Sequence, residues 1–167
     1  MINDSTSAST SFWKGTKGEY WVLAQLLLLV GFAWLPVYPK LPTVVFPWQF
    51  SIWFLSGLLA SLAGILLGRG VIDLGHNLTP LPYPKETGSL VQKGVYGLVR
   101  HPLYSGLVLG ALGWAIFQLS LSHILGSLVL LLFFNAKADR EEIWLSQKYP
   151  EYSEYRSHVK KLLPWLY

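Results

Sequence analysis

Two clusters of charged residues in this sequence could carry chemistry. The first lies in the segment GVYGLVRHPLYSG, residues 94–106, where Arg100 and His101 stand directly before an apolar run that begins at Pro102. Proline suits the first turn of a helix, where its missing N–H is not needed. The free N–H groups of that turn, beside a guanidinium and an imidazole, would form a receptor for a carboxylate. Taken alone, an Arg-His pair beside an apolar span is more often a topology anchor.

The second cluster follows another apolar run and consists of Lys137, Asp139, Arg140, Glu141 and Glu142. Lys137 and Glu141 are four residues apart and therefore share one face of a helix. Taken alone, the cluster is a solvated helix end with ion pairs worth roughly 0 to 1 kcal/mol each. If a tight hairpin brings it beside the first cluster, the two together could bind a zwitterion that carries an amino acid head and a ribose.

The composition is that of a membrane protein. Of the 167 residues, 52% are hydrophobic and 13% are charged, and the mean hydropathy is +0.39, which is too apolar for an ordinary soluble domain. Eight Trp and nine Tyr suit a chain that crosses two lipid–water interfaces. The basic residues are scattered and form no stripe, so we expect no nucleic acid partner. The absence of Cys excludes a thiolate metal site or nucleophile, and the four His lack ligand spacing, so we expect no metal.

Four apolar runs predict an all-α integral membrane protein with about four transmembrane helices, at residues 20–36, 48–69, 102–119 and 121–136. Each run is close to the roughly 17 to 25 residues that a spanning helix needs. The second run carries Ser56, Ala60, Gly64 and Gly68 at intervals of four, which predicts a packing face for another helix.

The segments outside these runs have different predicted roles. Residues 1–19 are expected to form a disordered tail, and residues 20–167 a single domain. The Pro- and Gly-rich loop before the third run is expected to be ordered and to contact a ligand. The fourth helix should continue past Asn135, and a short helix over residues 151–159 should turn Tyr152 and Tyr155 toward the membrane surface.

The basic residues also predict the orientation of the chain. With four spans, only Lys40 falls in a loop on one side, while the other Lys and Arg residues fall on the opposite side. By the positive-inside rule, that side is cytoplasmic and holds the long loop and both termini. The membrane would be the inner membrane of a prokaryote or the endoplasmic reticulum of a eukaryote.

The two charged clusters also carry a family resemblance. The segment GVYGLVRHPLYSG, followed by REEIWLSQKYPEYSEYRSHV and LLPW, resembles the RHPxYxG and EE signatures of the isoprenylcysteine carboxyl methyltransferase (ICMT/PEMT-like) family. HNLTPLPYPKETGSLV is similar to the upstream loop of that family, so the resemblance covers about residues 75–164. It implies methyl transfer from S-adenosyl-L-methionine, with a cofactor region at 75–104 plus 137–164.

The resemblance also implies a set of site residues. The expected cofactor-binding residues are Gly88, Ser89, Leu90, Val91, Tyr96, His101, Pro102, Leu103, Tyr104, Glu141 and Glu142. Lys137, on the substrate side, and Arg100 are the expected catalytic residues. Eukaryotic relatives carry an arginine where this chain has Lys137, and lysine keeps the charge without the planar, bidentate donor set.

The implied substrate is lipophilic or delivered from the bilayer. It could be a prenylated carboxylate, an amino headgroup, a quinone-like phenol or a thiol, and the sequence does not choose among them. One alternative is an NADPH-dependent reductase of the sterol-reductase type. Another is a nonenzymatic binding or transport protein, which would need polar residues lining a path through the membrane. Gln25 and Gln118 are the main candidates for such residues. The oligomeric state stays open.

Overall fold

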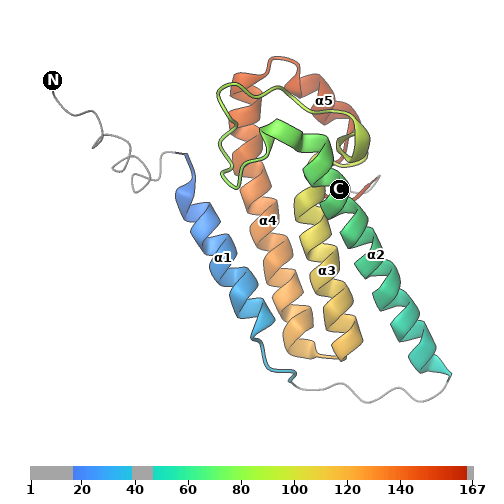
Figure 1. The fold of residues 1–167 in the computed structure, drawn as a ribbon. Coiled ribbons are helices and arrows are strands. Elements are labelled where there is room, and N and C mark those ends of the chain that lie inside the picture. The colour runs from blue at the N-terminus through green and yellow to red at the C-terminus, as the bar shows by residue number, and fades with distance from the viewer. Residues whose placement is uncertain (1–16, 39–46, 165–167) are drawn as a thin grey trace.

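The computed structural model describes residues 17–38 and 47–164, and this part of the chain is all-helical. Four long helices lie side by side, and a short fifth helix and two single-turn 3-10 helices lie at one end of them (Figure 1). The elements are α1 (Glu19–Ala33), α2 (Trp48–Leu74), η3 (Gly75–Asn77), η4 (Gly94–Gly97), α3 (Pro102–Gln118), α4 (Leu121–Lys148) and α5 (Tyr152–His158). The predicted fold class is confirmed in its helical part. The predictions for residues 1–16 and for Lys40 lie outside the described residues.

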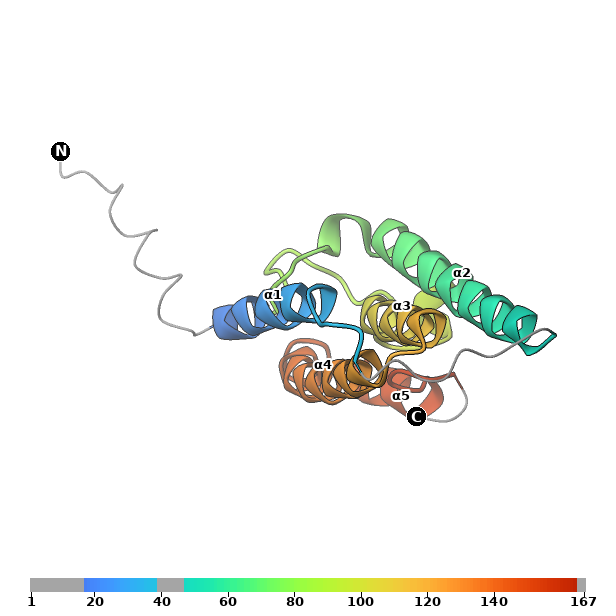
Figure 2. The same ribbon diagram turned by 90° about the horizontal axis from the view of Figure 1, so that it is seen from below.

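The helices follow the order α1, α4, α3, α2 across the molecule, so α3 lies between α2 and α4 (Figure 2). The predicted tight hairpin joins α3 to α4. It turns at Leu119, whose φ is 49°, and the Ser120 hydroxyl caps the start of α4. A small core forms where Leu28, Leu29 and Phe32 of α1 pack near Leu130 and Phe134 of α4.

The helices have the surface of a membrane protein. Both α2 and α4 are long and apolar enough to cross a membrane, and α1 and α3 are shorter apolar helices. Large apolar side chains point outward from all four, among them Leu27, Phe54, Phe117 and Leu132. Such a surface is stable in lipid and would aggregate in water. The helix α2 continues past the predicted end at residue 69 to Leu74, and α4 continues past Asn135 to Lys148, as predicted.

All charged residues of the described part lie toward one end of the helices. This end holds α5, the loop over residues 75–101 and the second half of α4 (Figure 1). The opposite end holds the Ser120–His123 turn. There the Nδ1 atom of the buried His123 ring is hydrogen-bonded to the Ser120 hydroxyl oxygen at 2.8 Å. We call the first of these the charged end.

The buried residues of α2, which face α3, include only Ser56 of the predicted small-residue stripe. Ser56, Ala63 and Gly70 are the buried residues of α2, whereas Ala60, Gly64 and Gly68 are exposed. In a helix with 3.6 residues per turn, residues spaced four apart point in directions that differ by about 40°. Residues spaced seven apart differ by only about 20°. The seven-residue set therefore follows the straight neighbouring helix more closely.

Substituting glycines on the two faces of this helix pair tests the packing. A Cβ at Gly106 of α3 would lie 2.7 Å from Leu67 Cγ and 3.1 Å from the Ala63 oxygen, whereas one at Gly64 meets nothing within 4 Å. We expect Gly106→Ala to destabilise the protein by about 1 to 3 kcal/mol through overpacking. Gly64→Ala should leave stability unchanged or raise it by up to about 1 kcal/mol, because alanine favours the helix.

The measurement is thermal unfolding of both variants in the same detergent. Equal midpoints for Gly106→Ala and Gly64→Ala would contradict the contact between α2 and α3.

Candidate functional site

The segment that carries Arg100 and His101 is fixed to the C-terminal part of the chain. The Arg100 and His101 backbone N–H groups donate to the carbonyl oxygens of Lys160 and Lys161 at 2.9 and 3.1 Å. One turn into α3, the Ser105 hydroxyl donates to the Leu162 oxygen at 2.6 Å. The start of α3 and residues 160–162 therefore form one unit at the charged end.

A buried ion pair joins this unit to α4. Both Nε and Nη2 of Arg100 lie 2.8 Å from Glu142 Oε1, and the two side chains are only 7% and 2% exposed. Arg100 Nη1 also donates to the carbonyl oxygens of Arg156 and Val159. The guanidinium thus holds α4, the start of α3 and the residues after α5 together, which is the geometry of a positioning residue.

His101 lies between the two neighbouring glutamates. Its Nε2 is 3.2 Å from Glu142 Oε1, and its Nδ1 is 3.7 Å from Glu141 Oε2. The imidazole stacks on the Tyr104 ring at 5.4 Å, and the Tyr104 hydroxyl donates to Glu141 Oε2 at 2.7 Å. Four residues that the sequence placed in two separate clusters therefore form one continuous polar network.

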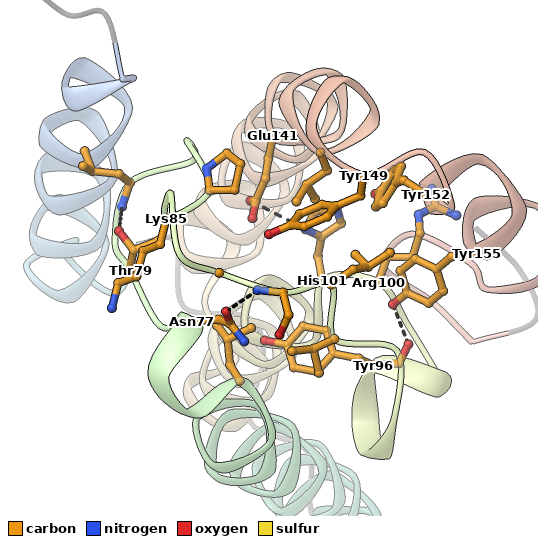
Figure 3. Close-up of a pocket in the computed structure, with 18 residues that line it drawn as sticks. Asn77, Thr79, Lys85, Tyr96, Arg100, His101, Glu141, Tyr149, Tyr152 and Tyr155 are labelled. Atoms are coloured by element: carbon orange, nitrogen blue, oxygen red, sulfur yellow. Dashed lines mark hydrogen bonds and ion pairs between the residues drawn. The ribbon is translucent and has the colours of Figure 1, made fainter.

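A first cavity lies between the loop before α3, the second half of α4 and α5 (Figure 3). Its wall contains eight of the expected site residues: Gly88, Ser89, Leu90, Val91, Tyr96, Arg100, His101 and Glu141. Sequence reasoning missed its other polar and aromatic lining residues, which are Asn77, Thr79, Lys85, Tyr149, Tyr152 and Tyr155. The wall thus combines one carboxylate, an amide and several aromatic rings.

Two glycines shape the loop around this cavity. The Asn77 side-chain oxygen accepts a hydrogen bond from the Ser89 N–H at 2.9 Å, and a Cβ at Gly88 would lie only 2.9 Å from the same oxygen. Gly94 has a φ of +64°, and a Cβ there would overlap the Asp73 carboxylate, which accepts from the Val95 N–H at 2.9 Å. The Asn77 and Asp73 side chains thus accept hydrogen bonds from loop N–H groups that a backbone carbonyl would otherwise accept. These bonds hold the loop in an ordered conformation, as predicted.

The α5 tyrosines correct one prediction. Tyr152 and Tyr155 were expected to face the membrane surface, but they are 1% and 6% exposed and face the interior. The Tyr155 hydroxyl donates to the Tyr96 oxygen at 2.6 Å. Burial raises the pKa of Tyr96, Tyr152 and Tyr155, so all three hydroxyls stay neutral at physiological pH. The physical reason for the difference is that α5 folds over Arg100 and shields its charge from water.

A second cavity adjoins the first on the side of the helices. Its volume is about 390 Å³, against about 90 Å³ for the first. Its wall includes Leu67 of α2, Leu107 of α3, Gln25 of α1 and Lys137 of α4. The two cavities share Leu74, Thr79, Tyr96, Arg100, His101 and Glu141. A molecule bound in one would therefore contact the same His101 and Glu141 side chains as a molecule bound in the other.

The expected site residues divide between the cavities. Pro102, Leu103 and Tyr104, expected at the cofactor, line the second cavity and not the first. Glu142, also expected there, lines neither of these two cavities, because its Oε1 atom faces Arg100 and His101. Within the described residues its Oε2 atom has no hydrogen-bond partner, and the Arg156 guanidinium lies 3.4 Å away.

Comparison with known proteins identifies the family. The sequence model of the phospholipid methyltransferase family matches residues 52–152, more than half of the chain. The chain belongs to this family.

The similar proteins are O-methyltransferases. The chain is 32% identical over 149 residues to a rice protein (Oryza sativa subsp. indica) named "Probable protein-S-isoprenylcysteine O-methyltransferase", covering 85% of this chain and 77% of the relative. It is 31% identical over 130 residues to protein-S-isoprenylcysteine O-methyltransferase B of Arabidopsis thaliana, covering 74% and 66%. A Schizosaccharomyces pombe protein-S-isoprenylcysteine O-methyltransferase is 29% identical over 130 residues, covering 75% and 55%. The family member described here is thus a methyltransferase, which decides against the reductase and transport alternatives.

Breaking the buried ion pair should unfold this end of the molecule. We expect Arg100→Met to destabilise the protein by about 3 to 5 kcal/mol, because it leaves the buried Glu142 carboxylate with only the more exposed Arg156 guanidinium at 3.4 Å as a cationic partner. Lys17→Met removes an exposed pair with Glu86 and should cost no more than about 1 kcal/mol.

The measurement is thermal unfolding in detergent, with protease sensitivity of residues 150–164 as a second readout. If Arg100→Met matches Lys17→Met in both, Arg100 does not hold the C-terminal segment.

Proposed function

We propose that this family member transfers the methyl group of S-adenosyl-L-methionine from the first cavity to a lipophilic acceptor in the second. The observation that carries the proposal is the adjacency of two cavities with His101 and Glu141 in both walls. Asn77, Thr79 and four tyrosines line the first together with apolar residues, and apolar residues of α2 and α3 line much of the second. Transfer between a polar donor and a lipophilic acceptor requires such an arrangement.

The residues of the first cavity fit this donor by their chemistry. A carboxylate at Glu141 and an amide at Asn77 suit an amino group and ribose hydroxyls, and the Tyr96 and Tyr149 rings suit a purine. The loop passes so close to Asn77 at Gly88 that a side chain there would fill the wall. When bound, S-adenosyl-L-methionine supplies an electrophilic methyl group, so the chain itself needs no nucleophile.

The work of the protein is then positioning and exclusion of water. Alignment of two reactants supplies roughly 7 to 11 kcal/mol in well-oriented reactions. Glu141 is held by the Tyr104 hydroxyl, and His101 is held by Glu142, so both side chains keep fixed orientations at the boundary of the cavities. The buried tyrosines of α5 form part of the wall of the first cavity.

The names of the relatives suggest the acceptor. They specify O-methylation of protein-S-isoprenylcysteine, and a carboxylate on a prenyl chain suits the second cavity of this chain. Its wall holds the ammonium of Lys137 besides Arg100, whose charge is paired with Glu142, and the apolar side chains of α2 and α3 would contact the prenyl chain. Lys137 would repel an amino headgroup, and the Glu141 carboxylate of the same wall already accepts from the Tyr104 hydroxyl, which favours a carboxylate acceptor over an amine.

The charged end would lie at the cytoplasmic face. All charged residues of the described part lie toward this end, and the positive-inside rule then assigns it to the cytoplasm. We propose that α1 to α4 are the four spans, that both termini are cytoplasmic, and that the acceptor enters from the bilayer.

Titration calorimetry of the detergent-solubilised protein with S-adenosylhomocysteine tests the donor site. We expect saturable binding that Glu141→Gln weakens about tenfold or more, because a charge-assisted hydrogen bond contributes roughly 1.5 to 3 kcal/mol. Glu154→Gln, on the exposed face of α5, is the matched control and should bind as the wild type does. Absence of binding to folded wild type in detergent and in lipid would refute the proposed donor.

A further inference from the structure

Gln25 is an unusual residue for its position. It is the one amide or charged side chain between Tyr20 and Ala33, in an otherwise apolar helix. A polar side chain in such a helix is costly unless it has a partner, and it commonly marks a functional site. Gln25 lies before residue 52, where the match to the family model begins, so it is not part of that match.

Its partner is the lysine of the second cavity. Lys137 Nζ donates to Gln25 Oε1 at 2.5 Å and to the Pro80 oxygen at 3.4 Å. The lysine is 1% exposed, and its ammonium lies 5.3 Å from the centre of the Tyr104 ring. An ammonium has three donors, so two are used and one is left for a molecule bound in the cavity.

The charge of Lys137 is not cancelled by an ion pair. Within the described residues no carboxylate lies within 4 Å of its ammonium, and the nearby Glu141 instead accepts from Tyr104. An amide oxygen satisfies a donor without neutralising the cation. A carboxylate at residue 25 would satisfy the same donor and also neutralise the Lys137 ammonium.

We propose that Gln25 is a positioning residue of the acceptor site, which holds the Lys137 ammonium in the wall of the second cavity with its charge intact. Through this contact α1 contributes to the selection of an acceptor with an anionic methyl-accepting group. The inference rests on the proposed function for the nature of the acceptor. It goes beyond that function in assigning part of the specificity to α1, which lies before the region matched by the family model.

The test compares Gln25→Leu and Gln25→Glu with Gln118→Leu, which removes the corresponding amide at the far end of α3. The probe is S-prenylated N-acetylcysteine in detergent micelles, with its carboxamide as the uncharged comparison. Probe binding is measured by displacement, and S-adenosylhomocysteine binding by calorimetry.

We expect Gln25→Leu to weaken binding of the carboxylate probe roughly five- to tenfold and Gln25→Glu to weaken it further. Both variants should leave carboxamide binding and S-adenosylhomocysteine binding unchanged, and turnover should show a raised KM rather than a lowered kcat. Gln118→Leu should behave as the wild type does.

A double-variant cycle shows whether Gln25 acts through Lys137. If it does, Gln25→Leu changes nothing further in a Lys137→Met background, since the positioned group is gone. Additive effects, unchanged carboxylate binding in Gln25→Leu, or no binding of the carboxylate probe by the wild type would each overturn the inference. Loss of S-adenosylhomocysteine binding in the wild type would instead refute the proposed donor, so the two failures are distinguishable.

Discussion

The buried ion pair between Arg100 and Glu142 is the interaction on which the rest of the charged end depends. Each partner would be costly alone in a buried site, so neither can be placed there without the other. The pair forces α4, the start of α3 and the residues after α5 to meet at one point. Once they meet, His101 is fixed between Glu141 and Glu142, and the loop before α3 has a wall to close against.

From this pair a polar network runs across the molecule to α1. Glu142 contacts His101, and His101 stacks on Tyr104. The Tyr104 hydroxyl donates to Glu141, and the Lys137 ammonium lies over the face of its ring. Gln25 ends the network. The two cavities lie along it, so one set of side chains defines the polar site, the apolar site and the boundary between them. A shift at one member changes both cavities.

The sequence predicted the parts of this arrangement that depend on local patterns. Apolar run length predicted the helices, Pro102 predicted the start of α3, and the short link before Leu121 predicted the hairpin. It could not predict contacts that depend on tertiary packing. The burial of Tyr152 depends on α5 folding over Arg100, and the packing face of α2 depends on the direction of its neighbour. The sequence offered one signal for the burial of α5: Tyr152 and Tyr155 are three residues apart and share one face of a helix that is otherwise rich in charged residues.

The contact between Gln25 and Lys137 joins residues 112 positions apart, and it bears on how this chain could use a lysine at the position where the family resemblance implies an arginine. A guanidinium is planar and rigid, so it can be oriented by few contacts, whereas an ammonium on a flexible stem takes its direction from its surroundings. The amide of Gln25 and the carbonyl of Pro80 supply that direction from two separate elements. A lysine therefore needs more hydrogen-bond acceptors around it than an arginine does to keep one orientation, and in this chain α1 supplies one of them through Gln25.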